Sequence, residues 1–455
     1  MLISKKYLIF KINIVNATKY LYNVVLKGLY MKLNKSRTAL VGLAFFTITI
    51  FWALYNNVIP LILKLTYNMN ELVSGIIMAS DNVLALFLLP FFGMLSDKTN
   101  TKLGKRMPFI IAGTLISAIL MLLLVYFDNP YKLTQFIIVL GFLLIGMSIY
   151  RSPAVALMPD ITPKPLLSKG NAIINLMGTI GGLATLVFIK ALSPKEGGNN
   201  YVLFGTIAAI MILSIIILQI FIKENKWRQE KEKEYPTAAG NTDNKENNNV
   251  KLSSAKKKSL ILLLASVFLW YLGYNSIESA FSKYAVVSWG LTEGKYSIPL
   301  IVASVSAIIS YIPLGMLATK IGRKKTILFG ITALAISFVS LALSKEYSQI
   351  LLVFFIMSGI GIAAINVNSY PMVIEIGKGG DIGKYTGYYY AASMASQIFT
   401  PIASGALLEY MGYWTLFPYA ALFVILSFVT MIFVKHGDSR PEKLKSKLEA
   451  FDIDD

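Results

Sequence analysis

Aromatic and amide side chains recur inside segments of this chain that are otherwise almost entirely apolar. Two of these segments carry similar groups, FWALYNNV at 51–58 and LWYLGYNSI at 269–277. Aromatic rings stack on the C–H face of a sugar, and amides exchange hydrogen bonds with its hydroxyl groups. We therefore expect a site for a sugar-like solute. Its expected residues are Trp52, Tyr55, Asn56, Asn57, Trp270, Tyr274, Asn275, Asn366 and Gln397. The alternative is that these groups only join helices, at about 0.6 kcal/mol for each hydrogen bond.

Three charged residues lie within the apolar segments. Asp81 and Arg151 lie away from the ends of their segments, and Glu278 lies near the end of its segment. A charge at the centre of a membrane costs about 2.5–3.5 kcal/mol, so such residues usually have a function. A carboxylate that can be neutralised is the simplest proton carrier. We expect these three residues to serve proton coupling, with a structural Asp81, hydrogen-bonded to a neighbouring helix, as the alternative.

A short basic loop, GMLSDKTNTKLGKRMPFI at 93–110, joins two apolar segments. Its length predicts a tight hairpin, in which Gly93 allows close backbone approach and the Asp97 carboxylate lies among cations. A similar sequence, GMLATKIGRKK, returns at 315–325. A loop motif repeated at half the chain length indicates two related halves.

Composition assigns the chain to a membrane class. Of its 455 residues, 55% are hydrophobic and only 15% are charged, with a mean hydropathy of +0.62. Apolar runs of roughly 20 residues match a hydrocarbon core about 30 Å thick, and lipid offers no partner to open backbone groups. The sequence predicts an all-α polytopic membrane protein with twelve transmembrane helices. They are expected at 39–62, 72–95, 108–127, 134–158, 170–190, 201–222, 259–282, 297–318, 325–343, 349–373, 384–408 and 413–434.

The chain has a net charge of +19, and its positively charged residues are distributed unevenly between the two sides of the membrane. Most of the 43 Lys and Arg residues fall on the side of the 93–110 loop, which predicts both termini in the cytoplasm and a multi-pass location in the cell membrane. This placement excludes nucleic acid as the expected partner. The chain has no Cys and a single His, His436, so we expect no metal site, no cofactor and no enzyme activity.

The expected organisation is six helices, a polar segment and six more helices. Residues 1–38 carry eight Lys or Arg and no acid, typical of a segment on the membrane surface, unless translation starts at Met31. The expected divisions are a basic N-terminal segment at 1–38, a six-helix bundle at 39–222, a disordered polar linker at 223–258, a second bundle at 259–434 and a tail at 435–455.

The loop pattern at 93–109 resembles the signature between the second and third helices of the major facilitator superfamily, and in particular its glycoside–cation symporter and sucrose-transporter branch. The resemblance covers residues 39–434 and implies two pseudo-symmetric six-helix bundles. It also implies a cytoplasmic gate. Carried over by position, the gate residues are Gly93, Asp97, Arg106 and Asp160, with Gly315, Gly322 and Arg323 in the second copy.

The chain departs from the pattern at three places. Thr319 replaces the aspartate in the second copy, so only the first copy should form the charge lock. The arginine of the sucrose-transporter motif falls on Val155. The sodium-site aspartates of melibiose-permease-like members fall on Ala85, Leu89 and Arg151, which favours a proton as the coupling ion.

The resemblance implies a monomeric, proton-coupled symporter of a sugar or glycoside that works by alternating access. Its expected partners are that solute, a coupling proton and membrane lipid. Two alternatives remain: an exporter of amphipathic or drug-like compounds, which would have a wider and more apolar cavity, and a non-transporting sensor or scaffold.

Overall fold

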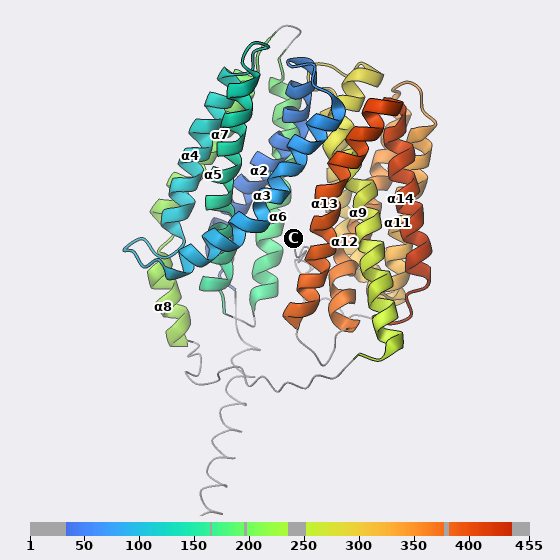
Figure 1. Ribbon diagram of the computed structural model, residues 1–455. Coiled ribbons are helices and arrows are strands. Elements are labelled where there is room, and N and C mark those ends of the chain that lie inside the picture. The colour runs from blue at the N-terminus through green and yellow to red at the C-terminus, as the bar shows by residue number, and fades with distance from the viewer. Residues whose placement is uncertain (1–32, 164–165, 195–197, 235–251, 377–381, 439–455) are drawn as a thin grey trace, which may run out of the picture.

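The computed structural model describes residues 33–163, 166–194, 198–234, 252–376 and 382–438. Within these residues, twelve helices are long and apolar enough to cross a membrane, which confirms the predicted fold class. They form two groups of six that stand side by side (Figure 1). The first half contains α2 (Lys35–Leu65), α3 (Glu71–Lys98), α4 (Met107–Tyr126), α5 (Leu133–Ile161), α6 (Leu167–Leu192) and α7 (Tyr201–Phe221). The second half contains α9 (Ser254–Trp289), α10 (Ser297–Ile321), α11 (Arg323–Ala342), α12 (Leu352–Ile376), α13 (Ile382–Met411) and α14 (Leu416–Ile432).

Small residues let neighbouring helices pack closely within each half. A Cβ atom on Gly113 of α4 would lie 2.8 Å from the backbone nitrogen of Tyr150 on α5. Gly330 of α11 and Gly361 of α12 face each other, and a Cβ on either one would lie within 2.7 Å of the other's carbonyl oxygen. Such contacts hold membrane helices together where lipid removes the hydrophobic driving force between them.

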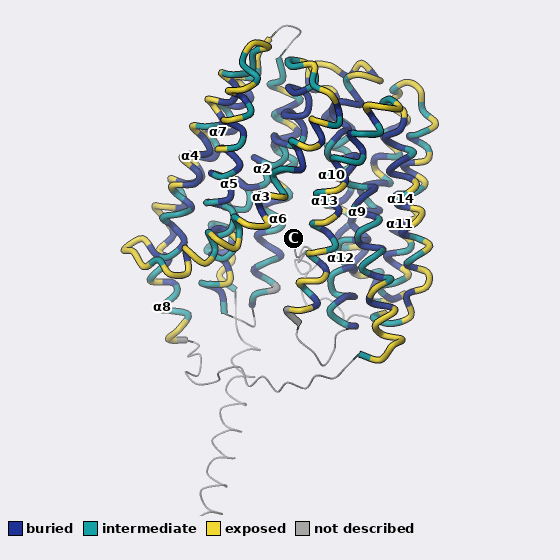
Figure 2. Tube along the Cα trace, viewed as in Figure 1, coloured by how far each residue is buried: buried dark blue, intermediate teal, exposed yellow. Residues whose placement is uncertain are grey.

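Exposed residues lie on the outside of the bundle and buried residues lie between the helices (Figure 2), and many of the exposed residues are large and apolar. Examples of these exposed side chains are Phe87, Ile119 and Ile309. An apolar exterior is what a hydrocarbon solvent favours.

The two ends of the bundle are named here by their contents. The α8 end carries the short helix α8 (Glu224–Glu234), the start of α2 and the end of α14 (Figure 1). The far end carries the loops 66–70 and 290–296. Two short 3₁₀ helices, η2 (Gln349–Leu351) and η3 (Tyr413–Thr415), also precede helices at the far end.

The segment 223–258 differs from the predicted linker. Residues 224–234 form α8, which packs on the first half, and α9 already begins at Ser254. Specific contacts fix α8 despite its polar composition: the Arg37 guanidinium lies 4.8 Å from the centre of the Trp227 ring and 2.7 Å from Glu230 Oε2. Residues 235–251 lie outside the described part, as do 1–32 of the expected N-terminal segment and 439–455 of the expected tail.

Candidate functional site

A cavity of about 360 Å³ lies between the two halves. Its walls come from α2 and α6 of the first half and from α9, α10, α11 and α12 of the second. Helices that approach from both halves can change the cavity whenever the halves move. The polar or aromatic side chains that line it include Phe45, Thr49, Trp52, Asn56, Asn57, Asn175, Thr179, Tyr274, Glu278, Ser304, Tyr311, Ser358 and Asn366.

Five of the nine residues expected to bind solute line this cavity, and four do not. Those that line it are Trp52, Asn56, Asn57, Tyr274 and Asn366. Tyr55 and Trp270 are 2% and 0% exposed and belong to the cores of their halves. Asn275 Nδ2 instead donates to Ser396 Oγ at 3.4 Å, and Gln397 Nε2 donates to Ser393 Oγ at 3.3 Å.

The position of Asn275 has a simple geometric cause. Its pairing with Asn56 required a one-residue gap between the two similar segments, and one residue turns a helical side chain by about 100°. Without the gap, Asn56 corresponds to Tyr274, and Tyr274 is the residue that lines the cavity. On α9 the lining face continues one turn further, to Ile277 and Glu278.

The sequence reasoning missed the contribution of α6 and α10. Asn175 and Thr179 of α6 line the cavity one helical turn apart, and Ser304 and Tyr311 of α10 line it two turns apart. The signal was present, because polar residues at spacings of four and seven share one helix face.

The three charges expected to serve coupling lie close together around the cavity wall. Asn56 Nδ2, from the first half, donates to Glu278 Oε1, from the second, at 3.4 Å. Asp81 on α3 accepts from Asn82 Nδ2 at 2.8 Å and lies within electrostatic range of both Arg151 and Glu278. Glu278 lines the cavity itself, eleven residues before α9 ends at Trp289, rather than near a helix end.

Trp52 stands between this charged group and the solute space. The Arg151 guanidinium lies over its ring, 5.4 Å from the centroid, while the same indole lines the cavity. Its Nε1 atom is buried and has no hydrogen-bond partner among the described residues. The cavity therefore contains a donor that a bound solute would satisfy.

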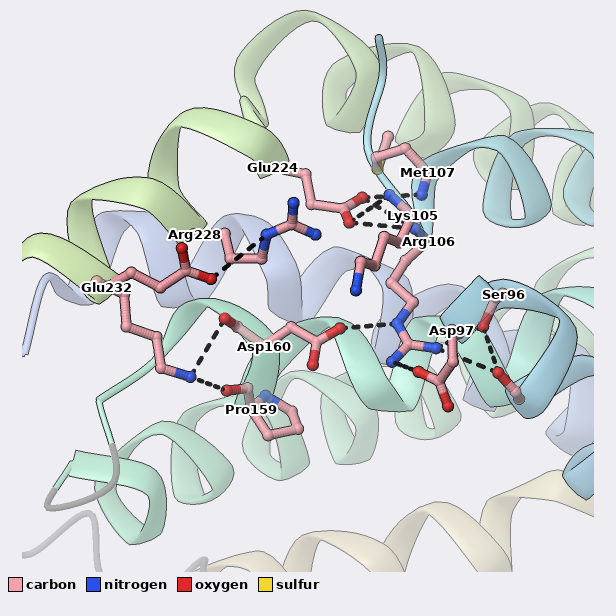
Figure 3. Close-up of polar contacts among 12 residues, drawn as sticks. Ser96, Asp97, Lys105, Arg106, Met107, Pro159, Asp160, Glu224, Arg228 and Glu232 are labelled. Atoms are coloured by element: carbon pink, nitrogen blue, oxygen red, sulfur yellow. Dashed lines mark hydrogen bonds and ion pairs between the residues drawn. The ribbon is translucent and has the colours of Figure 1, made fainter. Parts of the chain in front are cut away.

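The 93–110 loop forms a cluster around Arg106 at the α8 end (Figure 3). Arg106 Nε donates to Asp160 Oδ2 at 2.7 Å, a second guanidinium nitrogen pairs with Asp97, and a third donates to Ser96 Oγ at 2.5 Å. Burial alone would lower the pKa of Arg106, but the hydrogen bonds and charges of Asp160 and Asp97 raise it above its ordinary value. The residues carried over from the family motif thus meet around the charged guanidinium of Arg106. Its Nη1 atom also donates to the Gly93 carbonyl at 3.4 Å.

Glu224 of α8 supplies a contact that the sequence did not suggest. Its carboxylate accepts hydrogen bonds from the backbone N–H groups of Lys105, Arg106 and Met107, at 2.7 to 3.2 Å (Figure 3). These groups start α4, where a helix has unpaired donors and a positive dipole end. Lys231 Nζ, two turns further along α8, donates to the carbonyl of Pro159 at 2.7 Å. So α8 fastens the loop to the end of α5.

In the second copy of the motif, where Thr319 stands in place of the aspartate, the arginine pairs with a glutamate of another helix. Gly322, which adopts a φ of +94°, immediately precedes α11. The first residue of α11, Arg323, places its Nε atom 3.6 Å from Glu375 Oε2 on α12. Gly315 is buried in α10. Glu375 takes the role that Asp160 has in the first half, and its place near the end of the fourth helix of the repeat was a usable signal.

At the far end, buried polar contacts join the two halves. Glu71, the first residue of α3, is 1% exposed and forms an ion pair with Lys283 of α9. Its carboxylate also accepts from the Tyr413 hydroxyl and lies 3.1 Å from Lys64 Nζ. Its backbone N–H donates to Glu409 Oε2 at 2.7 Å. Nothing in the sequence reasoning singled out these residues.

Backbone packing reinforces the far-end closure. A Cβ on Gly405 of α13 would lie 2.5 Å from the Glu71 carbonyl oxygen, and one on Gly75 of α3 would meet the backbone at Pro401. At the α8 end, by contrast, Arg106 and Arg323 each pair within their own half. Within the described residues, no three His, Cys, Asp or Glu side chains converge as metal ligands.

Comparisons with known proteins agree with this architecture. A search among curated proteins gives no match. Solved structures that resemble the chain include the xylose transporter XylE from E. coli in an inward open conformation, with 15% identity, 90% of this chain and 97% of that chain covered, and a TM-score of 0.64. The nucleoside transporter NupG has 15% identity, 89% and 100% coverage, and a TM-score of 0.62. A bacterial homologue of the iron transporter ferroportin, in an inward-facing state, has 14% identity, 88% and 98% coverage, and a TM-score of 0.63.

At these sequence identities, similarity to the solved structures is evidence for the fold only. The family itself is shown by sequence: the model of the Major Facilitator Superfamily matches residues 41–310 and again residues 263–452. The first match covers the first half and continues through α9 into α10, and the second covers α9 to α14 of the second half. This chain belongs to the Major Facilitator Superfamily and is a multi-pass membrane transporter, not an enzyme.

Proposed function

We propose that the protein is a proton-coupled symporter of a neutral sugar or glycoside in the cell membrane, within the glycoside–cation symporter branch. The observation that carries the proposal is the cavity between the halves, where the Trp52 and Tyr274 rings stand beside the amides of Asn56, Asn57 and Asn366. Rings and amides in one cavity suit stacking on a pyranose and hydrogen bonding to its hydroxyls.

The charge distribution supports an orientation with the α8 end in the cytoplasm. Among the described residues, the loop after α3, helix α8 and the starts of α9 and α11 at that end are rich in Lys and Arg, as positive-inside placement requires. The halves are joined at the far end by the Glu71–Lys283 pair, so the described conformation is closed to the outside. Two of the similar solved structures are themselves inward open or inward-facing.

The charges beside the cavity support coupling to a proton. Asp81 lies within electrostatic range of Arg151 and of Glu278, and Glu278 accepts a hydrogen bond from Asn56 of the first half. In the proposed cycle Asp81 takes up a proton from outside, and Arg151 stabilises its ionised form once the proton has left. One proton that crosses ~150 mV releases about 3.5 kcal/mol, from ~2.3 kcal/mol per 100 mV, which supports a few-hundredfold accumulation.

Uptake of labelled sugars into proteoliposomes tests the proposal. A panel of pentoses, hexoses and glycosides is offered with and without an inward pH gradient, in sodium-free and sodium-containing buffer. We expect at least one carbohydrate to accumulate only with the pH gradient, whether or not sodium is present. Uptake that depends on sodium, or a panel in which only apolar compounds move, would overturn the proposal.

A further inference from the structure

Charge is distributed unevenly over the wall of the central cavity. Of the residues that line it in the described part of the chain, Glu278 is the single charged one. Arg151 does not line the cavity; its guanidinium lies over the ring of Trp52. Asp81, a second acid, lies within electrostatic range of Glu278. A solute in the cavity therefore meets a carboxylate directly and has no lining cation opposite it.

Beside the Trp52 Nε1 donor, two neutral side chains that line the cavity next to each other in the sequence offer acceptors. Asn57 is 6% exposed and lines the cavity; its Nδ2 donates to the Ala53 carbonyl at 2.9 Å, while its Oδ1 has no partner among the described residues. Asn56 Nδ2 donates to Glu278, so the Asn56 Oδ1 atom is the acceptor that this side chain offers to a solute. A buried acceptor without a donor costs about 1–3 kcal/mol, so the bound solute is expected to supply donors.

Three solute classes respond differently to such a wall. Hydroxyl groups donate as well as accept, and an ammonium group donates three hydrogen bonds and carries a charge opposite to that of Glu278. The rings of Trp52, Tyr274 and Tyr311 offer an ammonium group additional cation–π faces. An ionised carboxylate or phosphate offers no donor and is repelled by Glu278.

We propose that Glu278 and Asn57 make the cavity a charge filter: its solutes are neutral or amine-bearing carbohydrates, and sugar acids and sugar phosphates are excluded. This inference rests on the proposed function, because it presumes a carbohydrate in this cavity. It goes further by assigning Glu278 a part in selectivity beside any part in proton coupling.

Ligand-induced thermal stabilisation of the purified protein in nanodiscs at pH 7.5 tests the filter. The probes are matched trios that share one ring stereochemistry: the neutral sugar, its 2-amino derivative and its uronic acid, in the gluco, galacto and manno series. Concentration series give the Kd of each probe from the shift in melting temperature. In any series that binds, we expect the amino sugar to bind at least as tightly as the neutral sugar. The uronic acid should bind about a hundredfold more weakly, which equals about 2.8 kcal/mol at 1.4 kcal/mol per tenfold.

The variant Glu278→Gln should reduce the gap between uronic acid and neutral sugar at least tenfold and remove any advantage of the amine. The matched control is Glu346→Gln, which removes the same charge from an exposed position in a far-end loop and should change neither ratio. A uronic acid that binds the unmutated protein within tenfold of its neutral partner overturns the charge filter and leaves carbohydrate transport standing. If no trio binds in any series, the filter falls, and the proposed function falls with it unless a pentose or glycoside of the uptake panel is transported.

Discussion

The far-end ion pair allows a quantitative test of alternating access. The substitution Lys283→Met removes the cation from a pair whose side chains are 4% and 2% exposed and leaves the Glu71 carboxylate buried. Removing one partner of such a pair costs about 3–5 kcal/mol. We take the lower value, because Lys64 Nζ at 3.1 Å and the Tyr413 hydroxyl still contact Glu71. The cost applies only while the far end is closed, because opening returns Glu71 to water. A change of about 3 kcal/mol raises the ratio of open to closed forms about a hundredfold.

Cysteine labelling measures this ratio without background, because the chain contains no Cys. Ala79 of α3 is 2% exposed and lies one turn from Gly75 on the same helix face. An Ala79→Cys protein in intact cells should react slowly with a membrane-impermeant maleimide, and Lys283→Met should accelerate the reaction about a hundredfold.

Two controls accompany the labelling. Tyr131 is 94% exposed in a far-end loop, so Tyr131→Cys should react at once from outside if this end is extracellular. Lys295→Met removes a lysine whose side chain is 51% exposed and should leave the labelling of Ala79→Cys unchanged. A labelling rate that does not respond to Lys283→Met would refute the idea that this pair holds the outer side shut.

Three further predictions concern coupling, binding and the loop cluster. Asp81→Asn should abolish accumulation driven by a pH gradient yet leave exchange of labelled for unlabelled solute intact; a variant that still concentrates solute would make Asp81 structural. Asn56→Ala should weaken solute binding tenfold or more, because losing a buried hydrogen-bond partner costs about 1–3 kcal/mol, and an unchanged Kd would remove Asn56 from the site. At the start of α4, Glu224→Gln removes a charge that is worth roughly 0.3–2 kcal/mol at a helix N-terminus, and Glu224→Ala removes its three hydrogen-bonded contacts as well. Thermal unfolding should therefore rank unmutated, Gln and Ala proteins in that order, and equal stabilities would contradict the capping role.

The membrane fold was predictable because it depends on local composition. Apolar runs long enough to cross a bilayer cannot remain outside one, and backbone groups in lipid must pair within helices. The short loop at 93–110 likewise predicted that the Asp97 carboxylate lies among cations, and the structure pairs it with Arg106. Helix α8 escaped prediction because its composition is polar; what fixes it are particular pairs such as Arg37 with Glu230.

The site was only partly predictable, because residue type does not determine which way a helix faces. Trp52 and Asn56 line the cavity, while Trp270, which shares their repeat, is fully buried in its own half. The far-end cluster was missed for another reason. Glu71 and Lys283 sit beside predicted loops, where charges usually face water, and only the meeting of two distant helices buries them.

Solute-driven proton movement tests the central claim most directly. Lightly buffered proteoliposomes, with no initial pH gradient and the membrane potential clamped, receive an inward gradient of the carbohydrate found in the uptake panel, and a pH electrode follows the outer medium. Symport predicts that the medium becomes more alkaline as protons enter with the solute, and that Asp81→Asn abolishes this change. Entry of the carbohydrate without any change in outer pH would contradict proton-coupled symport.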